Sequence, residues 1–183
     1  IGVEVLLLDI CPNELNESEK QKKLSLDSKA VKNRIVNEMF NKCIKSKPSP
    51  IYSKNFIKRI KLGNFDDDIS KIKSADWIIE VVVEKLEIKQ KVFDLIEKHR
   101  TSGTIVTSNT SGIPIKLMSK GRSDDFNKNF AITHFFNPPR YLNLFEVIPS
   151  PNCDKHLLDF LLKYGEKYLG KTSILAKDTP AFI

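Results

Sequence analysis

The sequence has few glycines, and none of them belongs to a Gly-x-Gly-x-x-Gly turn. Only seven glycines occur in 183 residues. That turn binds a dinucleotide pyrophosphate, because its glycines let backbone N–H groups and a helix N-terminus approach the phosphates closely. The residues given therefore contain no phosphate-binding loop of this kind.

Cysteines are also scarce, and long apolar runs are absent. Cys11, Cys43 and Cys153 are far apart, odd in number and unlike the spacing of a zinc site. We interpret them as reduced thiols and expect a cytoplasmic protein. No apolar segment approaches the roughly 20 residues that cross a bilayer, so we expect no membrane span.

The net charge of +7 is concentrated between Lys20 and Lys61. A solvated helical face is the simpler explanation, and attraction of an anionic ligand is the functional one. The basic residues are not interleaved with stacking aromatic residues, and no nucleic-acid motif is present. We expect no nucleic-acid partner.

Apolar segments that read as strands alternate with amphipathic segments that read as helices. The clearest strand spans residues 77–83, and the clearest helices span residues 87–99 and 154–169, whereas residues 12–29 are polar and predicted to be mostly loop. This alternation predicts an α/β fold with an open sheet. Ligands of such sheets bind beyond the carboxyl ends of the strands. The polar residues at those ends are Asp9, Glu84, residues 108–111 and His134.

One segment, residues 134–148, combines a histidine with a carboxylate in an apolar setting. Its sequence is His-Phe-Phe-Asn-Pro-Pro-Arg-Tyr-Leu-Asn-Leu-Phe-Glu-Val-Ile, which places His134 at the end of one apolar run and Glu146 inside the next. A carboxylate that fixes the imidazole tautomer and stabilises the imidazolium makes histidine a general base near neutral pH. The alternative is a structural histidine held by a backbone partner.

Asp9 ends the first apolar segment. In a nucleotide-binding fold the second strand ends in an acidic residue that accepts hydrogen bonds from the ribose hydroxyls. The first strand and the phosphate loop would then precede Ile1. The alternative is an ordinary turn residue, since aspartate is common in turns.

Taken together, these segments resemble the NAD-binding domain of the 3-hydroxyacyl-CoA dehydrogenase family over nearly the whole chain. The resemblance rests on Asp9, on Ala-Asp-Trp-Ile-Ile-Glu-Val-Val-Val-Glu at 75–84 with Lys89 following, on Ser-Asn-Thr-Ser at 108–111, on His-Phe-Phe-Asn-Pro at 134–138, on Glu-Val-Ile at 146–148 and on Lys-Asp-Thr-Pro-Ala-Phe-Ile at 177–183.

The resemblance implies a catalytic group of three residues. His134 would remove the proton from the 3-hydroxyl of the substrate while C3 gives hydride to NAD. Glu146 would orient and charge-balance the imidazole. Ser111 would form hydrogen bonds near the substrate oxygen and the nicotinamide.

The resemblance also implies binding residues. Asp9 would bind the adenosine ribose and disfavour NADP, Asn137 would contact the nicotinamide ribose side, and Glu84 and Lys89 would line the cofactor groove. For Lys89 a solvated helix face is the alternative. The basic first long helix of the family helps to hold the CoA phosphates, and Lys42 and Lys45 are the candidates in this chain.

The fold implied is a Rossmann-like, doubly wound and mostly parallel sheet that lacks its first strand and glycine-rich loop. Residues 1–183 would be a truncated NAD-binding domain without the C-terminal helical domain. That absent domain would form a homodimer, and an enoyl-CoA hydratase region would be fused to the parent protein, as in multifunctional bacterial β-oxidation proteins. The fragment alone is expected to be inactive.

The function implied is NAD-dependent oxidation of (S)-3-hydroxyacyl-CoA to 3-oxoacyl-CoA. Two alternatives stay open. One is an NAD-dependent dehydrogenase of a small hydroxy acid without CoA. The other is a non-enzymatic module that binds an anion or a partner.

Overall fold

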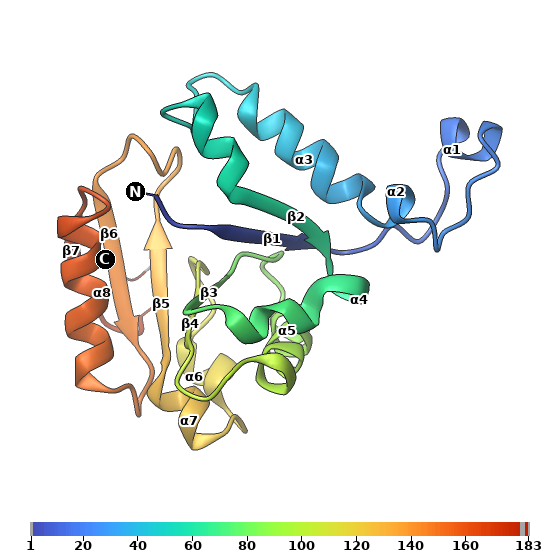
Figure 1. Cartoon of the computed structure of the whole chain (residues 1–183). Coiled ribbons are helices and arrows are strands. Elements are labelled where there is room, and N and C mark those ends of the chain that lie inside the picture. The colour runs from blue at the N-terminus through green and yellow to red at the C-terminus, as the bar shows by residue number, and fades with distance from the viewer. Residues whose placement is uncertain (1, 180–181, 183) are drawn as a thin grey trace. The chain divides into compact units, whose positions relative to one another are not determined.

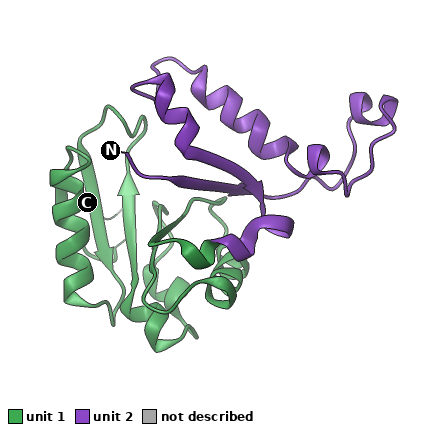
Figure 2. Ribbon diagram, in the orientation of Figure 1, with its two compact units in different colours: residues 1, 72–183 green, residues 2–71 purple. Residues whose placement is uncertain are grey.

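The computed structural model describes residues 2–179 and residue 182. They form two compact units, of which unit 2 comprises residues 2–71 and unit 1 comprises the described residues from 72 onward (Figure 2). Strands and helices alternate in both units, which confirms the predicted α/β class (Figure 1).

Unit 1 contains a five-stranded sheet in the order β3-β4-β5-β6-β7. Its strands are β3 (Trp77–Glu80), β4 (Ile105–Ser108), β5 (Phe130–Phe135), β6 (Leu144–Pro149) and β7 (Thr172–Leu175). All neighbours are parallel except β5 and β6, which are antiparallel. The helices are η2 (Ile69–Ser74, which begins in unit 2), α5 (Leu86–His99), α6 (Ile115–Ser119), α7 (Asp124–Lys128) and α8 (Lys155–Lys167). The sheet is therefore mostly parallel, as predicted.

Helices cover both faces of this sheet. On one face, Leu157 and Leu161 of α8 pack in a buried cluster with Ala131, Phe145 and Val147. On the other face, the rings of Phe93 in α5, Phe126 in α7 and Phe130 in β5 lie 4.8–5.6 Å apart. Because side chains alternate along a strand, His134 shares the face of Phe130 rather than that of Ala131.

Unit 2 contains a two-stranded parallel sheet of β1 (Val5–Asp9) and β2 (Ile60–Asn64). Helix α3 packs against both strands. The helices of this unit are α1 (Glu17–Gln21), α2 (Lys29–Lys32), α3 (Arg34–Ile44), η1 (Lys54–Arg59) and α4 (Phe65–Asp68).

One local prediction is wrong, and a second holds except for one short helix. The strand predicted over residues 77–83 ends at Glu80, because the Glu80 carboxylate accepts a hydrogen bond from the Val82 N–H at 2.6 Å and draws the chain out of the ladder. The segment predicted to be loop contains α1, which a capping box between Asn16 and Glu19 stabilises.

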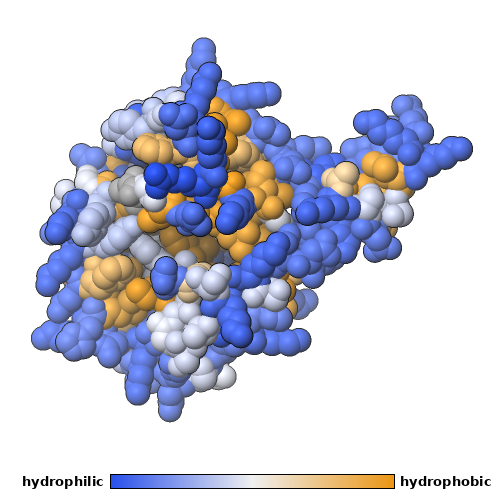
Figure 3. Space-filling view, in the orientation of Figure 1, coloured by the Kyte–Doolittle hydropathy of each residue, from blue (hydrophilic) through white to orange (hydrophobic). Residues whose placement is uncertain are grey.

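Strands β1 and β3 are less covered than their apolar sequences suggest. Val5 and Leu7 of β1 and Ile79 of β3 are exposed, and each of these strands has one hydrogen-bonded neighbour among the described residues. Hydrophilic residues predominate on the face shown in Figure 3, with apolar patches between them. Within the described residues, no helix is long and apolar enough to cross a membrane, and the three cysteines are free thiols.

A glycine inside α8 allows this helix to approach the sheet closely. Gly165 is buried, and a Cβ atom at this position would lie 2.7 Å from Cδ1 of Phe145 and 2.3 Å from the hydroxyl of Ser173. Both distances are shorter than a van der Waals contact. Close packing therefore explains why glycine occupies this position, although it makes a helix less stable than alanine does by about 1 kcal/mol.

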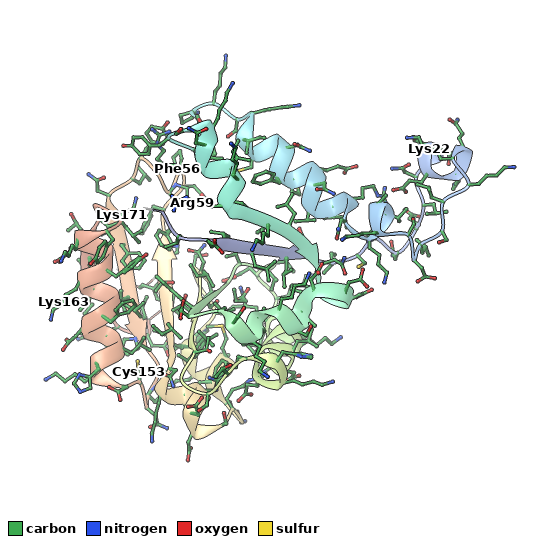
Figure 4. All side chains as sticks on the ribbon, in the orientation of Figure 1. Lys22, Phe56, Arg59, Cys153, Lys163 and Lys171 are labelled. Atoms are coloured by element: carbon green, nitrogen blue, oxygen red, sulfur yellow. The ribbon has the colours of Figure 1, made fainter. Side chains whose placement is uncertain are left out.

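We expect Gly165→Ala to destabilise the protein by about 1–3 kcal/mol, because overpacking against Phe145 outweighs the gain in helix propensity. The midpoint of urea unfolding measures this change. Lys163→Ala is the control, since Lys163 points outward from the same helix (Figure 4) and should change stability by less than about 0.5 kcal/mol. A stable Gly165→Ala variant would contradict the close packing.

Candidate active site

His134 and Glu146 form a direct pair across two strands. They face each other in the antiparallel register of β5 and β6, so that their side chains project from the same face of the sheet. The Nδ1 atom of His134 lies 2.5 Å from Oε2 of Glu146. The side chain of His134 is 15% exposed and that of Glu146 is 1% exposed. The two residues that the sequence singled out are therefore in contact.

The protonation pattern of this pair follows from its chemistry. An ionised carboxylate only accepts hydrogen bonds, so Nδ1 carries the proton and Nε2 has a free lone pair. The other carboxylate oxygen, Oε1, is buried and accepts no hydrogen bond from the described residues. A buried carboxylate with so few donors is poorly stabilised. Such a carboxylate stabilises an imidazolium when His134 takes up a proton.

Two phenylalanines flank the imidazole. The ring centroid of Phe136 lies 4.6 Å from that of His134, and the centroid of Phe182 lies 5.7 Å away at a steep angle. Their apolar surfaces limit the access of water to the His134–Glu146 pair, which strengthens electrostatic interactions there.

Ser111 lies in the turn that follows β4, and Glu84 holds this turn. The Glu84 carboxylate accepts hydrogen bonds from the Thr110 hydroxyl and from the backbone N–H groups of Ser111 and Gly112, the last two at 3.2 Å. The Ser111 side chain is exposed, and helix α6 begins after Pro114 without a side-chain cap. Ser111 is therefore not a helix cap, and its hydroxyl remains available for a ligand.

Lys89 is buried rather than solvated, which excludes the helix-face alternative. Its Nζ atom lies 2.9 and 3.1 Å from the two carboxylate oxygens of Glu80 and 3.3 Å from Glu84. The side chains of Lys89 and Glu80 are 1% and 0% exposed. Each charge neutralises the other where both are buried, so removal of either partner would leave an uncompensated buried charge. Any influence of Lys89 on a ligand would pass through Glu84.

The pKa of Glu84 lies below the ordinary value of a glutamate. Partial burial raises this pKa, but the hydrogen bond from Thr110 and the charge of Lys89 lower it by more. Glu84 is therefore ionised at neutral pH, as a clamp on three donors of the turn requires.

The remaining predicted site residues lie on exposed or half-buried surface of their own units. Asn137 is exposed just beyond β5, and the loop after it is held by Lys171, whose Nζ donates to the carbonyl oxygens of Pro139 and Leu142. In unit 2, Asp9 ends β1 and its Oδ1 accepts the Ile10 N–H at 2.8 Å.

Lys42 lies in the last turn of α3, and Lys45 is the residue that caps this helix. Both side chains are exposed. Their exposure leaves them accessible to an anion, but no contact among the described residues shows which anion they would bind. Among all the residues that the structure describes, no group of three histidine, cysteine or acidic residues is arranged to hold a metal ion.

Sequence reasoning assigned no individual role to two polar residues of unit 1, Glu80 and Asn109. The Ser108 hydroxyl donates to Oε2 of Glu80 at 2.5 Å, and Oδ1 of Asn109 accepts the Phe135 N–H at 2.9 Å. The available signals were a charged residue in the middle of an apolar run, for Glu80, and a position inside the Ser-Asn-Thr-Ser segment, for Asn109.

Comparison with known proteins gives a consistent result. The family model described as "3-hydroxyacyl-CoA dehydrogenase, NAD binding domain" matches residues 1–179. A probable 3-hydroxyacyl-CoA dehydrogenase of Bacillus subtilis is 51% identical over the whole chain, and a putative fatty acid oxidation complex trifunctional enzyme of Rickettsia prowazekii is 36% identical over 98% of it. The chain spans 23% of the length of each of these two relatives.

A solved structure supports the fold. The crystal structure of 3-hydroxybutyryl-CoA dehydrogenase from Escherichia coli superposes with a TM-score of 0.69 at 23% identity, covering 98% of this chain and 34% of that one. The chain therefore has the mixed α/β, mostly parallel, Rossmann-like fold of that structure.

The lowered pKa of Glu84 predicts how Glu84→Gln changes the pH dependence of stability. A carboxylate with a lowered pKa in the folded state contributes stability above its unfolded pKa of about 4.3. This contribution is lost as the pH falls through the folded pKa. We therefore expect wild type to be more stable than Glu84→Gln at about pH 6, with the difference shrinking toward about pH 3.

Urea unfolding at both pH values measures this difference. Glu87→Gln, a change of an exposed carboxylate in the first turn of α5, is the control. A wild-type advantage that grew on acidification would contradict the role of Glu84 as an ionised clamp.

Proposed function

Since the chain belongs to the family of 3-hydroxyacyl-CoA dehydrogenase NAD-binding domains, we propose that it carries the general base of an NAD-dependent oxidation of (S)-3-hydroxyacyl-CoA to 3-oxoacyl-CoA. The observation that supports the reaction is the His134–Glu146 pair, with Nδ1 and Oε2 2.5 Å apart and Glu146 fully buried. This pair leaves Nε2 of the imidazole as a proton acceptor.

In the proposed reaction, Nε2 of His134 accepts the proton of the substrate 3-hydroxyl. Bound NAD supplies the acceptor for the hydride that leaves C3. The imidazolium formed on His134 is stabilised by the Glu146 carboxylate, which is already in place and needs no reorganisation. In the reverse direction the same imidazolium returns the proton to the oxygen of the 3-oxo group.

Acceptors and donors at the strand ends fit the cofactor. Asp9 stands at the carboxyl end of β1, and one of its carboxylate oxygens bonds Ile10, which leaves the other for a ribose hydroxyl. Its charge would repel a 2′-phosphate. Ser111 is assigned to the substrate oxygen and the nicotinamide, and Asn137 to the nicotinamide ribose side. The Glu84 clamp, which Lys89 supports, is assigned to the cofactor groove.

The acyl-CoA substrate is supported by the charge of unit 2 and by the relatives. Lys42 and Lys45 are exposed cations near the end of α3 and are assigned to the CoA phosphates. The Bacillus subtilis relative carries 3-hydroxyacyl-CoA in its name. The Rickettsia relative is called a putative fatty acid oxidation complex trifunctional enzyme, which supports a dehydrogenase region within a longer protein. We also propose that the protein containing this chain forms a homodimer and is located in the cytoplasm.

We expect His134→Ala to lower kcat with acetoacetyl-CoA and NADH by about 10²- to 10⁴-fold, because the general base is lost. Glu146→Gln should lower kcat within the same range, since an amide cannot fix the tautomer or stabilise the imidazolium. NADH absorbance measures both effects in the protein with the native sequence that flanks these residues.

His156→Ala is the matched control, because His156 is an exposed histidine at the start of α8. It should retain wild-type turnover. Full activity of His134→Ala would rule out the proposed base. Turnover of a free 3-hydroxy acid but of no acyl-CoA would replace the substrate assignment with the non-CoA alternative.

A change at Asp9 tests the cofactor assignment separately. We expect Asp9→Ser to weaken the preference for NADH over NADPH by about 10-fold or more, because the charge that repels the 2′-phosphate is removed. The ratio of kcat/KM for the two cofactors measures this preference. An unchanged ratio would remove Asp9 from the adenosine ribose site.

A further inference from the structure

Asn109 joins the turn that carries Ser111 to the strand that carries His134. We infer that Asn109 is a positioning residue, which sets the placement of the Ser111 hydroxyl relative to the His134 imidazole. This inference rests on the proposed function, because it assigns Asn109 a role in that reaction.

The contacts of Asn109 extend to both sides of β4. Its backbone N–H donates to the carbonyl oxygen of Glu80 at the end of β3, at 2.9 Å. Its side-chain Oδ1 accepts the backbone N–H of Phe135 at the end of β5, also at 2.9 Å. Phe135 directly follows His134, and Asn109 lies two residues before Ser111. One side chain therefore couples the backbones on which both groups are mounted.

The side chain of Asn109 accepts a hydrogen bond from β5 beyond the point where the backbone pairing of β4 and β5 ends. The paired positions of β4 and β5 end at Ser108 and Ile132. Phe135 lies three residues beyond that last pair, where the backbone of β4 has already turned away. The side-chain carbonyl of Asn109 supplies the acceptor that the backbone of β4 no longer offers.

The turn is held differently on its two sides. Toward β3, Ser108 bonds to Glu80, and Thr110, Ser111 and Gly112 all bond to Glu84. Toward β5, the Asn109 side chain makes the one hydrogen bond that connects residues 109–112 to that strand within the described contacts. Loss of this bond would leave the turn anchored to β3 but no longer tied to β5.

This asymmetry makes the inference testable without unfolding the protein. The β3-side contacts should keep an Asn109→Ala variant folded. The distance between Ser111 and His134 would then be set less closely, and a misplacement of about 1 Å can cost about 10²-fold in rate. Asn109→Asp keeps an acceptor of the same length and should restore most of the rate.

The matched control is Asn129→Ala. Asn129 is also partly buried in unit 1, and its Nδ2 donates to the carbonyl oxygen of Asp125 at 2.8 Å, away from the candidate site. Each alanine variant thus loses one side-chain hydrogen bond to the backbone, and both should lower the thermal midpoint similarly. A purely structural role would give both the same kinetic effect.

The experiment measures kcat and KM with acetoacetyl-CoA and NADH in wild type and the three variants, with native flanking sequence present. We expect Asn109→Ala to lower kcat by about 10²-fold. Its KM for NADH should change by less than about threefold. Asn129→Ala should retain wild-type kcat, and Asn109→Asp should recover to within about 10-fold of wild type.

The outcomes separate the two ideas. Suppose that wild type is active. If Asn109→Ala then keeps its kcat, or if Asn129→Ala loses as much kcat as Asn109→Ala, the positioning role is overturned and the proposed function stays in place. Wild type that turns over no 3-oxoacyl-CoA overturns the proposed function, and the role of Asn109 falls with it.

Discussion

The antiparallel register between β5 and β6 is the constraint on which the candidate site depends. It sets His134 opposite Glu146 in a sheet whose other neighbours are parallel. Side chains alternate between the two faces of a strand, so a slip of one residue would point the histidine and the carboxylate in opposite directions. Phe145 and Val147 enforce this register, because both must reach the buried cluster under α8.

Buried charge gathers where the strands of unit 1 end. Glu80 and Lys89 are almost fully enclosed, and Glu84 extends the network to the turn after β4. Taking such groups out of water costs free energy, which their mutual attraction and hydrogen bonds offset when the geometry is good. The network holds a polar turn at the edge of the sheet, where a hydrophobic contact would not fix the direction of each N–H group.

The regular elements of unit 1 were predictable, and the irregular ones were not. Helix α5 differs from its predicted range by one residue, and the predicted helix over residues 154–169 contains α8, because apolar positions recur along both at the helical period. Strand β3 is shorter than its apolar run, since Glu80 captures the Val82 N–H. The short helix α7, like α1 of unit 2, escaped prediction because a single turn carries too few residues for a periodic pattern.

The candidate site divides in the same way. By itself the sequence determined the histidine and the carboxylate, their spacing and the segments around them, and so the family, because these features are local runs of residue types. Only the tertiary structure decided that Glu80 meets Lys89 and that Asn109 meets Phe135, 26 positions further on. These contacts depend on which strands are neighbours and where each ladder ends. The hydrophobic packing of whole helices and strands determines both, and no short segment encodes it.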